Sequence, residues 1–381
     1  MREWLKSAAV EALYGCLHLV RLCPVRARTV FFSAYAGKRV TCNPEAVCRK
    51  LRETYGDEFQ IEWCIRDEET RRKLETAGIK TVGFNTLAYF YRILTAKAVV
   101  LNDLSGCSYL PFGKRQTVIQ TWHGCGLYKK VGHDVPDETA GYHRRLRRIA
   151  KHIDLFTSGS TTFTETVIRG AFGYKGDVME TGLARNDMLM NEAARATANE
   201  KVRAFYDIDD KTPLVLFAPT FRNSGDTDEL WFEDETVKSA LQSRFPGYKV
   251  LVRTHYMAKE SQSQTALDVT GYPDIQELLC AADVLVSDYS SCIWDFSLTE
   301  KPCFLYAPDL SDYRCERDFY LDIHKWPFPL AETTGELAQQ LLQFDETAYK
   351  QAVSNHLSEL GSRETGNAAE TLCEFIAKQA R

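Results

Sequence analysis

Short apolar runs alternate with helical stretches from residue 29 onward. The apolar runs are continuous and rich in β-branched and aromatic residues, which is typical of buried strands. The predicted strands are residues 29–34, 60–65, 98–102, 117–122, 214–218, 249–253, 284–287 and 303–306. The predicted helices include residues 44–53, 68–76, 229–243, 274–281 and 291–298.

Alternation of this kind predicts an α/β fold, with parallel sheets covered by helices on both faces. Because the pattern occurs in each half of the chain, we expect two doubly wound, Rossmann-like domains, spanning residues 29–195 and 196–381. The polar helical stretch 191–207 is the predicted connection. Sheets of this class bind ligands beyond the carboxyl ends of their strands, so a cleft between the domains is the expected active site.

Residues 1–28 form a separate segment. Charged groups interrupt its apolar positions, and the run 13–22 is too short and too polar for a membrane-spanning helix. Glu11 inside the apolar region, and no clear small-residue cleavage site after it, disfavour a signal peptide. Trp4, Leu5, Leu19 and Leu22 give it an imperfect apolar face. Two interpretations stay open: an amphipathic helix on an anionic membrane surface, or a helix docked on its own domain.

The composition of the 381 residues, with 44% hydrophobic and 26% charged, is that of a globular protein. A formal net charge of −5 argues against a nucleic-acid partner, which usually requires a basic excess. Twelve cysteines are present without any CxxC pair, and most lie in apolar runs. They are predicted to be reduced, buried side chains of a cytoplasmic protein, with no metal site and no cofactor.

Polar residues follow one predicted strand of the first half. His123 and Gly124 come directly after the run 117–122, at the carboxyl edge of the sheet. An imidazole there has the chemistry of a general base, and the glycine lets a ligand approach the backbone. Taken alone, a histidine held by main-chain hydrogen bonds is the commoner case.

In the second half, polar residues follow three predicted strands, and a further cation lies nearby. They are Thr220 and Arg222, Arg253 and His255, then Asp288, Ser290 and Ser291, with Arg317 later in the chain. Arginine binds phosphate oxygens in a bidentate manner, and Ser290 or Ser291 at a helix start would add main-chain N–H groups. Surface ion pairs and an ordinary helix cap are the alternatives. Together these groups suit transfer chemistry on a diphosphate.

The stretches FFSAYAGKRVTCNPEAV, QTWHG, GLARND, APTFR, VRTH, VLVSDYSSCIWDF, KPCFLY and YRCERDFY resemble, in order and spacing, the CDP-glycerol glycerophosphotransferases of teichoic acid and capsule synthesis. The resemblance implies two Rossmann-like domains arranged as in B-type glycosyltransferases. It also implies a peripheral, monotopic enzyme of the cytoplasmic membrane face. That enzyme transfers glycerol phosphate from CDP-glycerol to a hydroxyl of a lipid-linked acceptor, either a prenyl-diphosphate-linked glycan or glycerol phosphate, and releases CMP.

The resemblance also implies roles for individual residues. His123 would be the base and His255 would stabilise the leaving CMP. The CDP-alcohol phosphates would contact Gly124, Thr220, Arg222, Ser290, Ser291 and Arg317. Arg253 and Asp288 would support them, whereas Arg185 and Asp187 match a motif without an assigned role.

The sequence departs from the family pattern at Cys125 and Gly126, which replace a Thr-Pro pair beside the proposed base. CDP-ribitol therefore remains an alternative donor, and a nucleotide-sugar transferase or a non-catalytic binding protein is the rival function. The chain length is close to that of primases, although single-module polymerases also exist.

The basic stretch 142–152 offers a contact for anionic headgroups, with a solvated helix face as the alternative. A divalent ion bound with the donor is possible but not indicated by ligand spacing.

Overall fold

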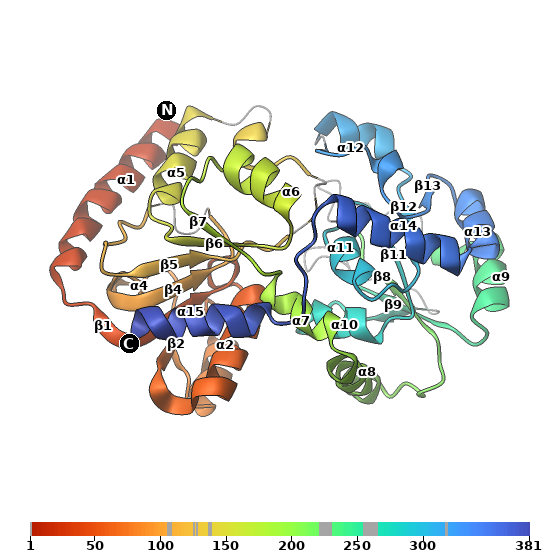
Figure 1. The fold of residues 1–381 in the computed structure, drawn as a ribbon, viewed down its shortest axis with the longest axis horizontal. Coiled ribbons are helices and arrows are strands. Elements are labelled where there is room, and N and C mark those ends of the chain that lie inside the picture. The colour runs from red at the N-terminus through yellow and green to blue at the C-terminus, as the bar shows by residue number, and fades with distance from the viewer. Residues whose placement is uncertain are drawn as a thin grey trace. The chain divides into compact units, whose positions relative to one another are not determined.

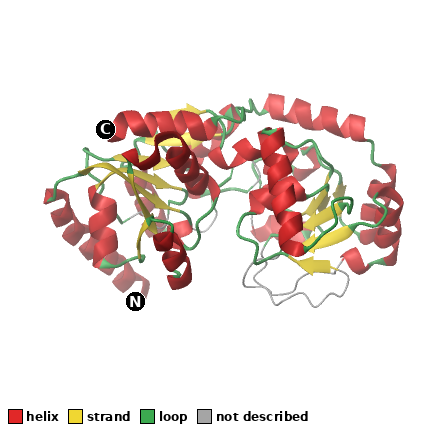
Figure 2. Ribbon diagram, turned by 90° about the horizontal axis from the view of Figure 1, so that it is seen from below, coloured by secondary structure: helices red, strands yellow, loops and turns green. Residues whose placement is uncertain are grey.

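The computed structural model describes residues 2–381 except 105–108, 125, 127–128, 136–138, 221–230, 254–265 and 317–318. The chain divides into two compact units. The first comprises Met1–Gly124, Val131–Asp187 and Arg363–Arg381, and the second comprises Cys125–Lys130 and Met188–Ser362. Helices cover the faces of the sheet in each unit (Figure 2).

The first unit contains a seven-stranded sheet whose strands are all parallel, in the order β3-β2-β1-β4-β5-β6-β7. The strands are β1 Arg26–Ser33, β2 Gln60–Cys64, β3 Lys80–Val82, β4 Ala96–Leu101, β5 Thr117–Gln120, β6 Leu155–Ser158 and β7 Asp177–Glu180. Its helices are α1 Arg2–Leu17, α2 Cys42–Tyr55, α3 Glu68–Thr76, α4 Leu87–Thr95, α5 Ala140–Ala150, α6 Thr161–Phe163 and α15 Ala368–Ala380 (Figure 1). Short helical turns include η1 His18–Leu22, η2 Tyr35–Gly37 and η7 Ala184–Asn186.

The second unit contains a six-stranded parallel sheet in the order β10-β9-β8-β11-β12-β13. The strands are β8 Leu214–Phe217, β9 Lys249–Val252, β10 Ala266–Asp268, β11 Val284–Ser287, β12 Cys303–Tyr306 and β13 Leu330–Ala331. The helices are α8 Glu192–Tyr206, α9 Glu235–Arg244, α10 Ile275–Ala281, α11 Cys292–Ser297, α12 Leu310–Glu316, α13 Thr334–Gln343 and α14 Glu346–Glu359, with α7 Asp187–Met190 at the division. The predicted α/β class with two doubly wound sheets is confirmed.

The segmentation along the chain differs from the predicted domains. The main part of the first unit reaches Asp187 rather than residue 195, the segment Cys125–Lys130 groups with the second unit, and the helical stretch predicted as the connection is α8 of the second unit. In addition, α15 belongs to the first unit, where Leu372, Cys373 and Ile376 join the apolar core of β1, β2 and α2. Sequence periodicity predicts a helix there, but only long-range packing decides which sheet it covers.

The N-terminal helix α1 packs within the first unit. Glu11 forms an ion pair with Arg148 of α5 at 2.5 Å, and the Arg148 guanidinium lies 4.1 Å from the ring centroid of Tyr14. Contacts of this kind are those of a helix docked on its own domain. Leu19 and Leu22 of η1 nevertheless remain 69% and 82% exposed. Among the described residues, no helix is both long and apolar enough to cross a bilayer.

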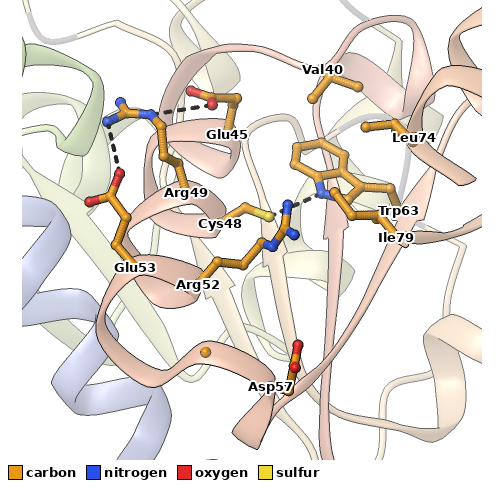
Figure 3. Close-up of a pocket in the computed structure, with 11 residues that line it drawn as sticks. Val40, Glu45, Cys48, Arg49, Arg52, Glu53, Asp57, Trp63, Leu74 and Ile79 are labelled. Carbon is orange, nitrogen blue, oxygen red and sulfur yellow. Dashed lines mark hydrogen bonds and ion pairs between the residues drawn. The ribbon is translucent and has the colours of Figure 1, made fainter. Parts of the chain in front are cut away.

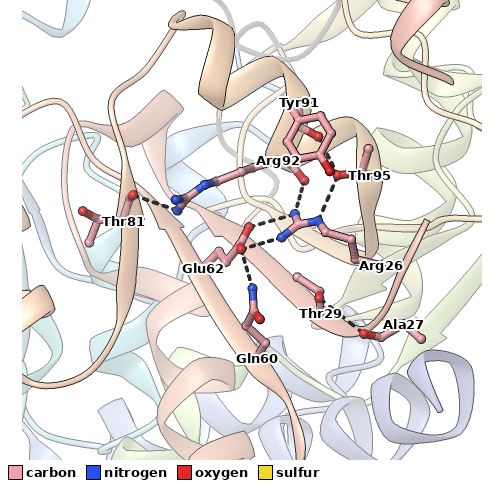
Figure 4. Close-up of polar contacts among 9 residues, drawn as sticks. All are labelled: Arg26, Ala27, Thr29, Gln60, Glu62, Thr81, Tyr91, Arg92 and Thr95. Atoms are coloured by element: carbon pink, nitrogen blue, oxygen red, sulfur yellow. Dashed lines mark hydrogen bonds and ion pairs between the residues drawn. The ribbon is translucent and has the colours of Figure 1, made fainter. Parts of the chain in front are cut away.

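A buried ion pair anchors the first strand of the sheet. Glu62 of β2 is 1% exposed and accepts hydrogen bonds from Arg26 Nη1 at 2.6 Å and Nη2 at 2.9 Å (Figure 4). Gln60 donates to the same carboxylate, and Arg26 also donates to Thr95. Because a buried carboxylate is costly unless it is paired and fully hydrogen-bonded, this network is a structural one.

Candidate active site

Two adjacent strand ends build the first half of the candidate site. In the first sheet the strand order reverses between β1 and β4, which is where doubly wound sheets bind ligands. After β1, the main-chain N–H of Tyr35 donates to Asn102 Oδ1 at 2.7 Å, and that of Ala36 donates to Asp103 Oδ2 at 2.9 Å. Asn102 and Asp103 follow β4, so side chains from one strand end hold the loop of the other.

His123 lies beside this crossing, three residues after β5. Its Nδ1 is 2.6 Å from the main-chain oxygen of Asn102. A carbonyl oxygen can only accept, so Nδ1 carries the proton and the lone pair of the neutral ring is on Nε2. Among the residues that the structure describes, none donates to or accepts from Nε2. The ring is therefore oriented as a general base requires.

The surroundings of His123 favour its neutral form. Burial lowers the pKa of the imidazole, and the positive charge of Arg185 lowers it further, against the opposing effects of the Asn102 carbonyl and Asp103. The ring lies 4.2 Å from the ring of Trp122 and 5.3 Å from that of Tyr35, measured between centroids. At neutral pH the imidazole is thus able to accept a proton.

The backbone around His123 is strained. Trp122 has φ 51, and Tyr35, Ala36 and Cys42 also adopt positive φ values. Side chains with a Cβ rarely adopt this conformation, which costs about 1–3 kcal/mol per residue. Strain of this kind persists where surrounding contacts hold it, and here Gln120 Oε1 accepts the Trp122 N–H at 2.9 Å.

The segment GLARND connects this loop to the end of the chain. Arg185 Nη1 donates to the His123 carbonyl at 2.7 Å. Asp187 accepts the N–H groups of Ala368 and Ala369 at the start of α15, at 3.0 and 2.8 Å, and burial raises the pKa of its carboxyl. The motif residues without an assigned role thus contact the His123 loop and the last helix, respectively.

The corresponding crossing of the second sheet lies between β8 and β11. Asp288, 3% exposed after β11, accepts three hydrogen bonds of 2.7–3.0 Å from the N–H and hydroxyl of Thr220, which follows β8. Arg253, after β9, donates to the carbonyls of Val269 and Tyr272. The side chains of Asp288 and Arg253 therefore shape the loops at this sheet edge.

Ser290 and Ser291 lie between β11 and the short helix α11. Ser291 occupies the position before the first helical residue, but its side chain makes no capping hydrogen bond, and Ser290 Oγ accepts from Cys292 Sγ at 3.2 Å. The serine cap predicted from the sequence is thus absent for Ser291. The predicted site residues Arg222, His255 and Arg317, and also Cys125, lie outside the described residues.

Sequence reasoning overlooked two asparagines of this site. Asn102 orients His123 through its carbonyl and the Tyr35 loop through its side chain. Asn43, fully buried at the start of α2, donates to the carbonyls of Thr121 and Trp122. For Asn102, the available signal was a polar residue directly after a strand. For Asn43, it was a polar residue directly before Pro44, where the sequence predicts the start of a helix. In both cases the hydrogen-bond partners are far away in the sequence.

A hollow of about 510 Å³ opens elsewhere on the first unit (Figure 3). Its lining includes the apolar side chains of Trp63, Leu74 and Ile79 and the charged groups of Arg49 and Arg52. Arg49 pairs with carboxylates of its own helix, and Trp63 donates to Cys48 Sγ at 3.3 Å. None of the predicted site residues lines this hollow, so it is separate from the candidate active site.

Residues 16–378 match the family model described as CDP-Glycerol:Poly(glycerophosphate) glycerophosphotransferase. A teichoic acid poly(glycerol phosphate) polymerase of Bacillus subtilis is 29% identical over 87% of the chain, which spans only 46% of that relative. A teichoic acid glycerol-phosphate transferase of Staphylococcus aureus is 27% identical, with 99% of this chain and 100% of that protein covered. A teichoic acid ribitol-phosphate primase of Bacillus spizizenii is 26% identical over 97% of this chain and 96% of its own.

The fold is also that of a solved relative. The structure of the wall teichoic acid polymerase TagF superposes with a TM-score of 0.81 over 99% of this chain and 95% of its own, at 24% identity. This likeness confirms the predicted fold of two Rossmann-like domains as in B-type glycosyltransferases. With nearly the whole chain matched by the family model, the protein belongs to the CDP-glycerol:poly(glycerophosphate) glycerophosphotransferase family of teichoic acid polyol-phosphate transferases.

Proposed function

We propose that the protein transfers glycerol phosphate from CDP-glycerol to a hydroxyl of a lipid-linked acceptor and releases CMP. The geometry of His123 carries this proposal. A neutral imidazole with its proton fixed on Nδ1 by a carbonyl presents Nε2 to an incoming hydroxyl. In the proposed step, the acceptor oxygen attacks the β-phosphorus of the donor, its proton moves to His123 Nε2, and the bond to the CMP oxygen breaks.

The second unit supplies the donor site in this proposal. Arg222, His255 and Arg317 balance the charge of the diphosphate, and Ser290 and Ser291 lie along the phosphates. Gly124 of the first unit is also proposed to contact the phosphates. Asp288 supports this role because it accepts the Thr220 N–H and hydroxyl and so fixes the loop that leads to Arg222. No resident metal is part of the proposed step, since these cations balance the charge directly.

The donor alcohol is a separate part of the proposal. CDP-glycerol is the proposed donor, and CDP-ribitol is the second candidate because relatives of nearly equal identity carry glycerol and ribitol names. The purified protein is incubated with each donor, or with a nucleotide-sugar, and a panel of prenyl-diphosphate glycans. CMP release and product mass with CDP-glycerol support the proposal, whereas release of a nucleoside diphosphate from a sugar donor contradicts it.

We further propose that the enzyme acts at the cytoplasmic face of the membrane as a peripheral protein. The exposed cations Arg144, Arg147 and Lys151 lie on or next to α5, which packs against α1, and the nearby η1 exposes Leu19 and Leu22. Each such cation contributes about 1 kcal/mol near an anionic surface. Sedimentation with liposomes tests this: binding to anionic vesicles should exceed binding to neutral ones, and equal binding would contradict the electrostatic contribution.

A further inference from the structure

Three successive main-chain carbonyls of the loop that carries His123 are bound by two buried side chains. Asn43 Nδ2 donates to Thr121 O at 3.2 Å and to Trp122 O at 3.0 Å. Arg185 Nη1 donates to His123 O at 2.7 Å. Asn43 is 0% exposed and Arg185 is 7% exposed, so both donor side chains lie in the interior of the unit.

The two side chains are also joined to each other. Asn43 Oδ1 accepts the main-chain N–H of Arg185 at 3.0 Å, and Arg185 Nη1 lies 3.3 Å from the thiol of Cys42. The side-chain amide of Asn43 thus donates to the loop after β5 and accepts from the η7 turn, two segments that are far apart in the sequence. A connection of this kind fixes the loop after β5 against the start of α2 and the η7 turn.

This connection holds the strained part of the loop. Trp122, with φ 51, lies between the carbonyl groups that Asn43 and Arg185 bind. If the carbonyls were released, the peptide could relax, and the His123 ring would rotate away from the Asn102 carbonyl. Displacements near 1 Å in a reacting group are sufficient to cost about 10²-fold in rate.

We infer that Arg185 and Asn43 are positioning residues for His123, Arg185 acting through the His123 carbonyl and through its charge, and Asn43 through the two preceding carbonyls. The inference rests on the proposed function, because His123 is the base only in that reaction. Arg185 has a second effect that purely structural residues lack. Its guanidinium, opposed by the carboxylate of Asp103, favours the neutral imidazole.

Arg185→Gln, Arg185→Lys and Asn43→Ser separate these effects. With Arg185→Gln we expect kcat to fall roughly 10- to 100-fold, with KM for CDP-glycerol within about twofold of the wild type. The pKa of His123, followed by NMR of ¹⁵N-histidine-labelled protein, should move upward. With Arg185→Lys the positive charge remains, so the pKa should stay and kcat should recover in part. Asn43→Ser should lower kcat without raising this pKa.

Arg203 provides the matched control. It is 5% exposed in the second unit and donates from Nη1 to the carbonyls of Asp209 and Thr212 at 2.7 and 3.0 Å. Arg203→Gln should lower the thermal midpoint as Arg185→Gln does, yet leave the His123 pKa unchanged. If Arg185→Gln does not fold, Arg185→Lys and Asn43→Ser still report on the loop through kcat and the ¹⁵N shifts of His123.

The outcomes distinguish the inference from the proposed function. An inactive His123→Gln variant together with unchanged kcat and unchanged His123 pKa in Arg185→Gln would overturn the positioning role alone. An active His123→Gln variant would overturn the assignment of the base. The NMR titration would then still show whether Arg185 controls the ionisation of the ring.

Discussion

The strand-order reversals of the two sheets are built in different ways. In the first unit, the loops after β1 and β5 adopt left-handed backbone conformations at Tyr35, Ala36 and Trp122, held by side-chain amides, the Asp103 carboxylate and an arginine. In the second unit, Asp288 accepts three hydrogen bonds from Thr220 in the loop after β8, and Ser287 Oγ donates to the Ala218 carbonyl of the same loop at 2.6 Å. The first arrangement fixes one imidazole precisely, whereas the second orders a loop that leads to a cation. This difference fits a division of labour between the proposed base of the first unit and the proposed phosphate site of the second.

Removing the imidazole is expected to have the largest effect. In His123→Gln, kcat should fall by about 10²–10⁴-fold because no group remains to take the hydroxyl proton. CMP release at saturating CDP-glycerol measures it. His324→Gln, a change at an exposed histidine of the second unit, is the control and should keep wild-type turnover. Near-full turnover in His123→Gln would contradict the assignment of His123 as the base, and with it the proposed difference in role between the two sheet edges.

Removing the Asp288 carboxylate of the second unit is expected to weaken donor binding, whereas removing the His123 imidazole lowers kcat. Asp288→Ala removes the carboxylate that accepts the half-buried Thr220 N–H and hydroxyl, so we expect CDP-glycerol affinity to fall roughly tenfold or more by calorimetry.

Asp234→Ala is the matched control, because Asp234 also accepts main-chain N–H groups, from Thr236 and Val237. It should cost stability and leave donor affinity unchanged. Equal losses of affinity in both variants would mean that Asp288 has only a general structural effect.

The GLARND segment supports the loop of His123 through Arg185. It can be altered at Gly182 without changing His123 itself. Gly182 has φ +94, and a Cβ there would lie 2.6 Å from Glu364 Oε2, whose carboxylate also accepts the N–H of Leu183. We expect Gly182→Ala to lower the free energy of unfolding by about 1–3 kcal/mol in urea. Gly271→Ala, where no atom lies within 4 Å of the new Cβ, should cost far less. Equal costs would show that the turn is not specially constrained.

The smallest effect concerns pH. Burial lowers the pKa of His123, His133 and His152 in the first unit and of His356 in the second. Unfolded chains bind these protons near pH 6.5, so the folded state loses stability as pH falls from 6.5 toward the lowered values. Thermal midpoints between pH 7.5 and 5.5 should therefore decrease, and amide hydrogen exchange should rise first in the first unit. A constant midpoint, or earlier exchange in the second unit, would contradict this expectation.

The sequence predicted the strands that lie inside the sheets better than those at the edges. Residues 284–287 and 303–306 agree with β11 and β12, because their apolar runs are buried on both faces. The short edge strands β3, β10 and β13 were overlooked, since two or three residues give no periodic signal. The inner strand β6 was overlooked as well, although all four of its residues are buried.

The sequence by itself determined the fold class, the family motifs and the identity of the proposed base, because these depend on local patterns and on spacing along one chain. Only the tertiary structure decided that α15 covers the first sheet, that Asn102 selects the tautomer of His123, and that Asn43 and Arg185 hold its loop. The sequence separation is 21 residues between Asn102 and His123, and 326 residues between Val47 of α2 and Cys373 of α15, whose thiol donates to the Val47 carbonyl. Hydrogen bonds and packing between such distant segments leave no periodic trace in the sequence, so they become visible only once the chain is folded.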